Sequence, residues 1–199
     1  MNEQNIRNGI MFSISGPSGV GKGTIVNAVK EGHPNFGVSV SATTRAPRGE
    51  EKDGVEYYFK TDEEFDKMIE EGDIIEYDTF VGKRYGTPAA PLKKMVESGE
   101  DCLLDITILG SLALKDKFKN DAVTIFVLPP SLEVLAQRLR DRGTESEEKI
   151  QERLNTAKSE VLQAGKFDYI VVNDDLDKAV AEVESIITAE HLKSERFKV

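Results

Sequence analysis

Apolar residues along this chain gather in five short runs, and most of these runs are separated by segments whose apolar residues repeat every three or four positions. The five runs, each of which predicts a buried strand, are Gly9–Ser15, Gly37–Ser41, Cys102–Thr107, Ala122–Leu128 and Asp168–Val172. The segments with helical spacing are Lys22–Glu31, Leu112–Phe118, Leu132–Asp141, Glu147–Ala164 and Leu176–Glu190. Strands that alternate with helices predict an α/β fold in which a five-stranded parallel sheet lies between helical layers.

A stretch in the middle of the chain, from about Arg45 to Gly86, interrupts the alternation. It is charged and aromatic, and turn residues divide it into short strand-like pieces such as Val55–Phe59 and Ile74–Phe80. We expect a partly antiparallel lobe inserted into the core.

Capping residues predict where three helices begin. Thr61 followed by Glu64 fits a capping box, and so does the segment from Thr144 to Glu147 before the long helix. Thr87 is expected to cap another helix, with Pro88 in its first turn.

The composition excludes several classes of protein. Lys and Arg number 26 against 36 Asp and Glu, a formal net charge of -10, which disfavours nucleic acid and anionic membranes as partners. No apolar stretch approaches about 18 residues and no secretory signal is visible, so we expect a cytosolic protein. With one cysteine and two distant histidines, a metal is expected to bring oxygen ligands.

The segment between the first predicted strand and the first predicted helix carries the clearest chemistry. It consists of Gly16, Pro17, Ser18, Gly19, Val20, Gly21, Lys22, Gly23 and Thr24. Glycines let successive N–H groups point inward at a phosphate, and the helix N-terminus adds partial positive charge. Lys22 supplies a full charge for the outer phosphates of ATP. A plain glycine-rich turn is the alternative, but it would need neither six loop residues nor a lysine.

Two oxygen-bearing residues are candidates to hold Mg²⁺ through water. The usual pattern has Ser or Thr directly after the lysine, whereas here Gly23 stands there and Thr24 follows. Asp105, at the end of an apolar run, is the second candidate, although a single aspartate also suits a strand end as a cap.

A second phosphate site is predicted in the inserted lobe. Arg45 and Arg48 stand three residues apart with Pro47 between them, and Tyr57 follows. Two arginines can grip a phosphate bidentately while phenolic hydroxyls complete the shell. A solvated charged loop is the alternative.

Several segments together resemble the guanylate kinase family over nearly the whole chain. The matching segments are Gly16–Gly19, Ser41–Arg48, Ile75–Tyr77, Tyr85–Thr87, Pro129–Ser131, Arg142–Glu145 and Asn173–Asp175. The resemblance implies phosphoryl transfer from ATP to GMP or dGMP with Mg²⁺. It also implies one domain, with a core of about 1–44, 96–136 and 167–199, a GMP-binding lobe of about 45–95 and a helical lid of about 137–166.

The resemblance implies roles for individual residues. The GMP phosphate would be held by Arg45, Arg48, Tyr57 and Tyr85, and the guanine by Ser41, Glu76, Thr87 and Thr107. Arg138 and Asn173 would contact ATP, with Asn173 near the adenine. Lys22, Arg48, Arg142 and Arg153 would surround the transferring phosphoryl group, whose charge is spread over its equatorial oxygens. For Arg138 and Arg153, an ordinary place on a helix surface is the alternative.

Two positions depart from the family's pattern. Thr107 stands where a carboxylate is usual, and Leu109 where a glutamine is usual. A hydroxyl is a weaker partner than a carboxylate for the guanine amine by about 1–2 kcal/mol, so we expect weaker or broader acceptor choice.

Two rival functions remain open from the sequence. One is a nucleoside monophosphate kinase with another acceptor, and the other is a binding module that holds a phosphorylated peptide in the acceptor pocket. The sequence does not decide between a monomer and a homodimer.

Overall fold

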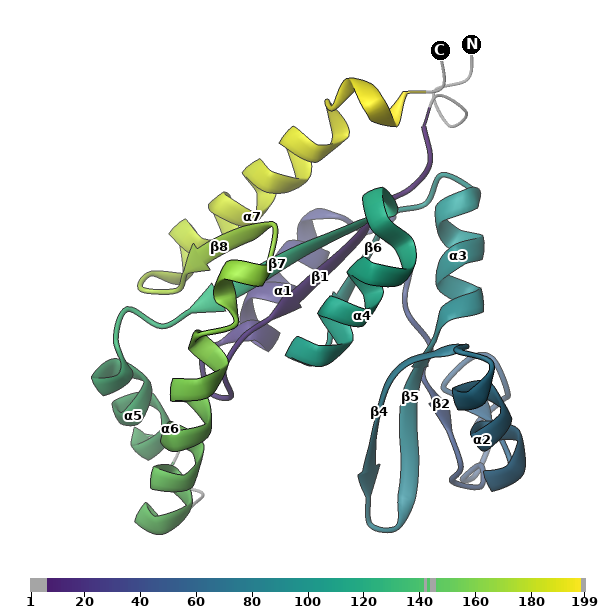
Figure 1. Ribbon diagram of the computed structural model, residues 1–199, viewed down its shortest axis with the longest axis horizontal. Helices are drawn as coiled ribbons and strands as arrows, with labels where there is room; N and C mark the ends of the chain where they lie inside the picture. The colour runs from purple at the N-terminus through teal and green to yellow at the C-terminus, as the bar shows by residue number, and fades with distance from the viewer. Residues whose placement is uncertain (1–6, 142, 144–145, 198–199) are drawn as a thin grey trace.

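The computed structural model describes residues 7–141, 143 and 146–197, which form a parallel sheet with helices on both faces and a smaller mixed sheet beside it (Figure 1). The strands of the parallel sheet, in spatial order, are β6 (Cys102–Asp105), β1 (Met11–Ser15), β7 (Ala122–Leu128) and β8 (Tyr169–Val172). Met11 pairs with Cys102 on one side and with Ala122 on the other. The carboxyl ends of the strands therefore share one edge, where open α/β sheets bind ligands.

The strand predicted at Gly37–Ser41 is wrong, and the described part of the parallel sheet has four strands instead of five. Gly37 forms a single bridge with Cys102, and its N–H donates to the Asp101 carbonyl at 2.7 Å. Beyond this point the backbone leaves the sheet, and Val38 is 64% exposed. An apolar run becomes a strand only where a partner strand continues beside it, and this segment turns instead towards the smaller sheet.

Successive residues of β1 point to opposite faces of the parallel sheet, which creates two separate cores. Phe12 and Ile14 pack with α1 (Lys22–Gly32) and α7 (Leu176–His191). Met11, the neighbour of Phe12, packs with α3 (Ala89–Glu97) and α4 (Ile108–Phe118) on the other face. The result is a three-layer α/β arrangement.

The smaller sheet forms the lobe at the lower right of Figure 1. Its strands, in spatial order, are β3 (Tyr58–Phe59), β2 (Ala42–Thr43), β5 (Lys83–Pro88) and β4 (Ile74–Phe80). Helix α2 (Asp62–Glu70) covers it through the fully buried Phe65, and the capping box predicted at Thr61 and Glu64 is confirmed.

Two further helices project from the opposite side of the molecule, at the lower left of Figure 1. They are α5 (Leu132–Asp141) and α6 (Glu147–Val161), which share a small core of their own. Three short 3-10 helices complete the described elements: η2 (Lys119–Asp121), η3 (Ala164–Lys166) and η4 (Ser194–Arg196).

The other helix starts differ from expectation. Thr87 lies within β5, and Pro88 is the N-cap of α3, so the predicted cap is wrong. Thr144 lies outside the described residues, and Ser146 caps α6 by accepting from the Lys149 N–H.

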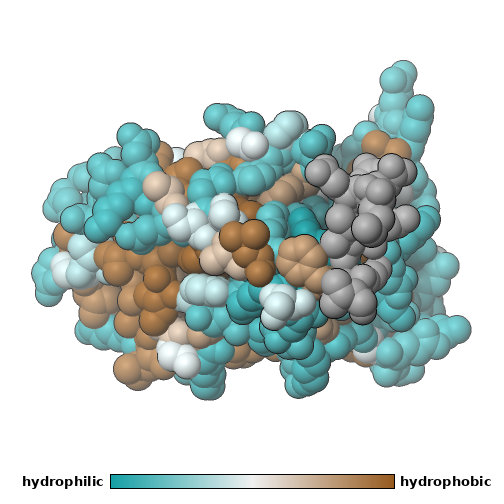
Figure 2. Space-filling view, turned by 90° about the horizontal axis from the view of Figure 1, so that it is seen from above, coloured by the Kyte–Doolittle hydropathy of each residue, from teal (hydrophilic) through white to brown (hydrophobic). Residues whose placement is uncertain are grey.

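The surface seen from the side of the chain ends is mostly hydrophilic around an apolar area on the left (Figure 2). Within the part of the chain that the structure describes, no helix combines the length and the apolar character needed to cross a membrane.

Candidate active site

The loop between β1 and α1 is shaped by glycines that other residues could not replace. Gly16 has a φ of 146°, and a Cβ there would lie 2.3 Å from the Val127 carbonyl oxygen. Gly21, the N-cap of α1, has a φ of 101°, and a Cβ there would lie 2.5 Å from the Asn173 amide nitrogen. Because neither position has room for a side chain, the loop can pass close to β7 and leave the amide groups at the start of α1 accessible to an anion.

Lys22 reaches back across this loop. Its ammonium donates to the carbonyl oxygens of Gly16 at 2.7 Å and Pro17 at 3.2 Å. The loop and the first turn of α1 line a pocket of about 380 Å³ that also contains Asn27 and Asp105. The glycines of the loop and the lysine at the start of the helix therefore lie together around one pocket, an arrangement that suits an anion.

Asp105 at the end of β6 faces the start of α1. A Cβ on Gly23 would lie 3.9 Å from an oxygen of its carboxylate, and Thr24 lines the same pocket. Removal from water raises the pKa of Asp105, and the nearby Lys22 works in the opposite direction. Carboxylate and hydroxyl oxygens suit a water-bridged Mg²⁺, so the residues present fit that ion.

Asn173, expected near the adenine, and Arg138, expected to contact ATP, both lie beside Val20. The Asn173 amide donates to the Val20 carbonyl at 2.8 Å, and the Arg138 guanidinium approaches the same oxygen at 3.5 Å. They line a pocket of about 350 Å³ with Gly19, Gly21 and Asp141. Asn173 thus braces the phosphate-binding loop as well as bordering the open space next to it.

Helix α6 contacts the phosphate-binding loop from the other side. The Arg153 guanidinium donates to the Ser18 hydroxyl at 3.0 Å. Two turns further along the helix, burial raises the pKa of Glu160, while Lys22 and a hydrogen bond from the Ser18 N–H work against that shift. Arg142, also expected here, lies outside the described residues. The sequence reading missed Glu160, because a glutamate on an acidic helix carries no distinguishing pattern.

The arginine loop of the lobe is organised by Glu51, a residue that the sequence reading missed. The Arg45 guanidinium donates to the two Glu51 carboxylate oxygens at 2.9 and 3.0 Å, and the Arg48 N–H donates to one of them at 2.7 Å. The hydrogen bonds with Glu51 raise the pKa of Arg45, with a smaller contribution from Tyr85. The Arg45 guanidinium also lies over the Tyr57 ring, 5.2 Å from its centroid. The spacing of three residues between Arg48 and Glu51 was the sequence feature that could have indicated this contact.

Three of the predicted phosphate-binding residues are gathered around one hollow. Arg45, Arg48 and Tyr85 line a space of about 500 Å³, and the Tyr57 ring packs edge-on against Tyr85 with centroids 5.9 Å apart. The side chain of Arg48 is exposed. The four residues form one cationic and phenolic cluster that suits a phosphate group.

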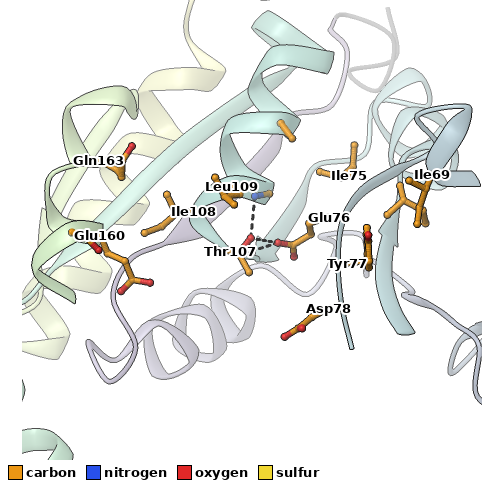
Figure 3. A pocket seen from close by; sticks show the side chains of 14 residues that line it. Ile69, Ile75, Glu76, Tyr77, Asp78, Thr107, Ile108, Leu109, Glu160 and Gln163 are labelled. Carbon is orange, nitrogen blue, oxygen red and sulfur yellow. Dashed lines mark hydrogen bonds between the residues drawn. The ribbon is translucent and has the colours of Figure 1, made fainter. Parts of the chain in front are cut away.

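A larger pocket of about 750 Å³ is bounded by the lobe, the core and helix α6 (Figure 3). Glu76 of β4 points towards Thr107 and the start of α4, and the Glu160 side chain enters from the side of α6. Leu109 also lines this pocket and is 78% exposed. Ser41 and Thr87 do not line it, and Thr87 is buried. The structure thus brings together Glu76 and Thr107, whereas the other two expected base contacts are not among the residues that line this pocket.

A glycine-lined loop between a parallel strand and a helix, with a lysine at the helix start, defines an α/β protein that binds nucleotides through a phosphate-binding loop. The guanylate kinase family model matches residues 10–190. A guanylate kinase of Halalkalibacterium halodurans is 46% identical over 95% of this chain and 92% of its own length. One of Caldanaerobacter subterraneus is 46% identical over 96% and 93%.

A solved structure agrees with these sequence relatives. The crystal structure of guanylate kinase from Anaplasma phagocytophilum matches with a TM-score of 0.69 and 33% identity, covering 98% of this chain and 93% of that one. The chain belongs to the guanylate kinase family.

Proposed function

We propose that this protein transfers the γ-phosphoryl group of ATP to GMP and dGMP, giving ADP and GDP or dGDP, within purine nucleotide metabolism. The observation that supports the proposal is the presence of two clusters of anion-binding groups, each of which lines a pocket. The loop around Lys22 is one site, and the cluster of Arg45, Arg48, Tyr57 and Tyr85 is the other. Membership of the family agrees with this function.

At the donor site, the chain's own groups hold the phosphates. The amides of residues 16–24 receive the β- and γ-phosphates, and the Lys22 ammonium exchanges the Gly16 and Pro17 carbonyls for phosphate oxygens. Arg138 and Asn173 contact ATP from the pocket that they line, with Asn173 near the adenine. Thr24 and Asp105 would hold hydrated Mg²⁺, which when bound offsets phosphate charge.

At the acceptor site, phosphate and base are held by different parts of the lobe. Arg45, Arg48, Tyr57 and Tyr85 bind the GMP phosphate, and Glu76 accepts hydrogen bonds from the guanine. Ser41 and Thr87 reach the guanine O6 once the lobe closes. A carboxylate favours guanine over adenine because adenine has an acceptor at N1 and no adjacent amine.

Around the transferring group, positive charge lowers the barrier without a covalent intermediate. Lys22, Arg48 and Arg153 provide it, together with Arg142 from outside the described residues. Arg153 is already beside the phosphate-binding loop through Ser18. Every residue named in this proposal comes from one chain, so the mechanism is the same for a monomer or a homodimer. We also propose that the enzyme works in the cytosol.

A panel of acceptors with MgATP tests this function, with ADP release as the measurement. GMP and dGMP are expected to give ADP, and AMP, UMP and CMP to give little. Lys22→Met is the matched control and should lower kcat by about 10²–10³-fold. Equal turnover of another base would make this a kinase of altered acceptor choice. ADP release with no acceptor at all, together with tight binding of a phosphorylated peptide, would overturn the proposal.

A further inference from the structure

The carboxylate of Glu76 is hydrogen-bonded at the N-terminal end of α4 (Figure 3). The Thr107 N–H donates to Glu76 Oε2 at 2.9 Å, and the Thr107 hydroxyl donates to the same oxygen. Thr107 is the N-cap of α4, and its hydroxyl oxygen accepts from the Gly110 N–H at 3.0 Å. The Glu76 carboxylate therefore lies at the positive end of a helix and is held by two donors from one residue.

Gly110 provides the space for this carboxylate. A Cβ at Gly110 would lie 2.2 Å from Glu76 Oε2 and 2.6 Å from its carboxyl carbon. The φ of Gly110 is outside the left-handed region, so the helix backbone itself does not need a glycine there. The glycine is needed because a side chain from a strand 34 residues earlier in the sequence occupies the place of its Cβ.

The hydrogen-bonding capacity of Thr107 decides what it can offer to a ligand. A hydroxyl has one proton and two lone pairs. The proton goes to Glu76, and one lone pair receives the Gly110 N–H. The lone pair that remains can only accept. Next to it stands Glu76, which as a carboxylate also only accepts, so this corner of the pocket suits a base edge with two neighbouring donors.

We propose that Thr107 and Gly110 are positioning residues for acceptor choice: Thr107 fixes the Glu76 carboxylate before the nucleotide enters, and Gly110 leaves the space in which that carboxylate lies. This inference rests on the proposed function and deepens it. Besides the contact with the guanine amine that the family resemblance implies, Thr107 therefore has a second role, which is to hold the carboxylate of Glu76 in place.

Gly110→Ala tests the positioning without endangering the fold. Alanine is a better helix former than glycine, so α4 should form at least as well, while its methyl group displaces the Glu76 carboxylate. KM is to be compared for GMP and for IMP, which has the N1–H of guanine but no amine. We expect KM for GMP to rise about tenfold, kcat to change less than about twofold, and the preference for GMP over IMP to fall about tenfold.

Two further comparisons complete the test. Gly165→Ala is the matched control, because a Cβ there meets nothing within 4 Å and its φ is not left-handed, so both KM values should stay unchanged. Thr107→Val should lose the preference for GMP over IMP, and Thr107→Ser should keep it.

The results that would overturn the positioning role differ from those that would overturn the proposed function. A Gly110→Ala enzyme with the parent's KM and the parent's GMP preference would overturn the positioning role. Equal preferences in Thr107→Val and Thr107→Ser would overturn the role of the hydroxyl. If the parent protein phosphorylates no nucleotide, the proposed function fails instead, and calorimetric binding of GMP and IMP to the same variants still decides the positioning.

Discussion

Asp101 is the most heavily engaged carboxylate near the chain ends. Its two oxygens each accept from the Arg7 guanidinium at 2.8 Å, one also accepts from the Ile10 N–H at 2.8 Å, and the His191 ring lies 2.9 Å from the other. Burial raises the pKa of Asp101, but the hydrogen bonds from Arg7 and the adjacent His191 ring outweigh burial and lower it to about 2. A single residue thus ties the N-terminal segment, the start of β6 and the end of α7 together.

Removing the arginine should leave a buried charge without its partner. We expect Arg7→Ala to lower the free energy of unfolding at pH 7 by about 3–5 kcal/mol, because desolvation of Asp101 is then poorly offset. The pKa of Asp101 in the folded parent is below its unfolded value of about 3.9, so its stabilisation is present above that value and is lost as pH falls through about 2. The difference between parent and variant should therefore narrow in acid.

Urea unfolding between pH 7 and pH 2.5 measures both effects. Lys93→Ala, which removes an exposed pair with Glu97 at 3.8 Å, is the control and should stay within about 0.5 kcal/mol of the parent at every pH. A variant at Arg7 with the parent's stability would refute the argument.

At the scale of elements, the sequence correctly predicted the helix ends that depend on residues close by in the chain. Helix α5 has the predicted bounds, and α1 and α7 end one residue beyond theirs, because their apolar spacing and end residues are local. Helix α4 begins at Ile108 instead of about Leu112, since its start depends on the Thr107 cap and on Glu76 from another strand. The strand at Gly37–Ser41 failed for the same reason, because a strand needs a partner that periodicity cannot reveal.

The contribution of the capping box to the stability of α2 can be tested directly. Thr61 accepts from the Glu64 N–H at 3.1 Å, and the Glu64 carboxylate accepts from the Thr61 N–H at 2.8 Å. We expect Thr61→Ala to lower the free energy of unfolding by about 1 kcal/mol and to speed amide exchange most in α2, because the Glu64 N–H loses its acceptor. Thr61→Ser keeps the oxygen and should exchange like the parent. Exchange in α2 that is the same for alanine and serine would rule out the cap as its cause.

At the scale of the whole molecule, the two halves of the site were predictable and their joining was not. Gly16–Thr24 and the pair Arg45 and Arg48 carry their chemistry in consecutive residues, so sequence reasoning found them. Contacts that join distant segments, such as Arg153 with Ser18 and Glu76 with Gly110, depend on the folded arrangement. Because water in the pocket bounded by lobe, core and α6 would compete with the acceptor, we expect these parts to close around the nucleotides for phosphoryl transfer.

Closure can be followed by energy transfer between dyes on the lobe and on α6. Cys102 is the chain's one cysteine and is buried, so Val81→Cys at the tip of the β4–β5 hairpin and Gln151→Cys on α6 can be labelled selectively. Because ADP and GMP cannot react, they should draw the dyes together and hold them there, and GMP alone should produce a smaller change. The same pair in a background with Arg45→Ala should close less at equal GMP, since the lobe then has a weaker hold on the acceptor phosphate. If calorimetry shows both nucleotides bound while transfer efficiency stays at its unliganded value, the lobe and α6 do not move towards each other, and phosphoryl transfer must take place in the open arrangement.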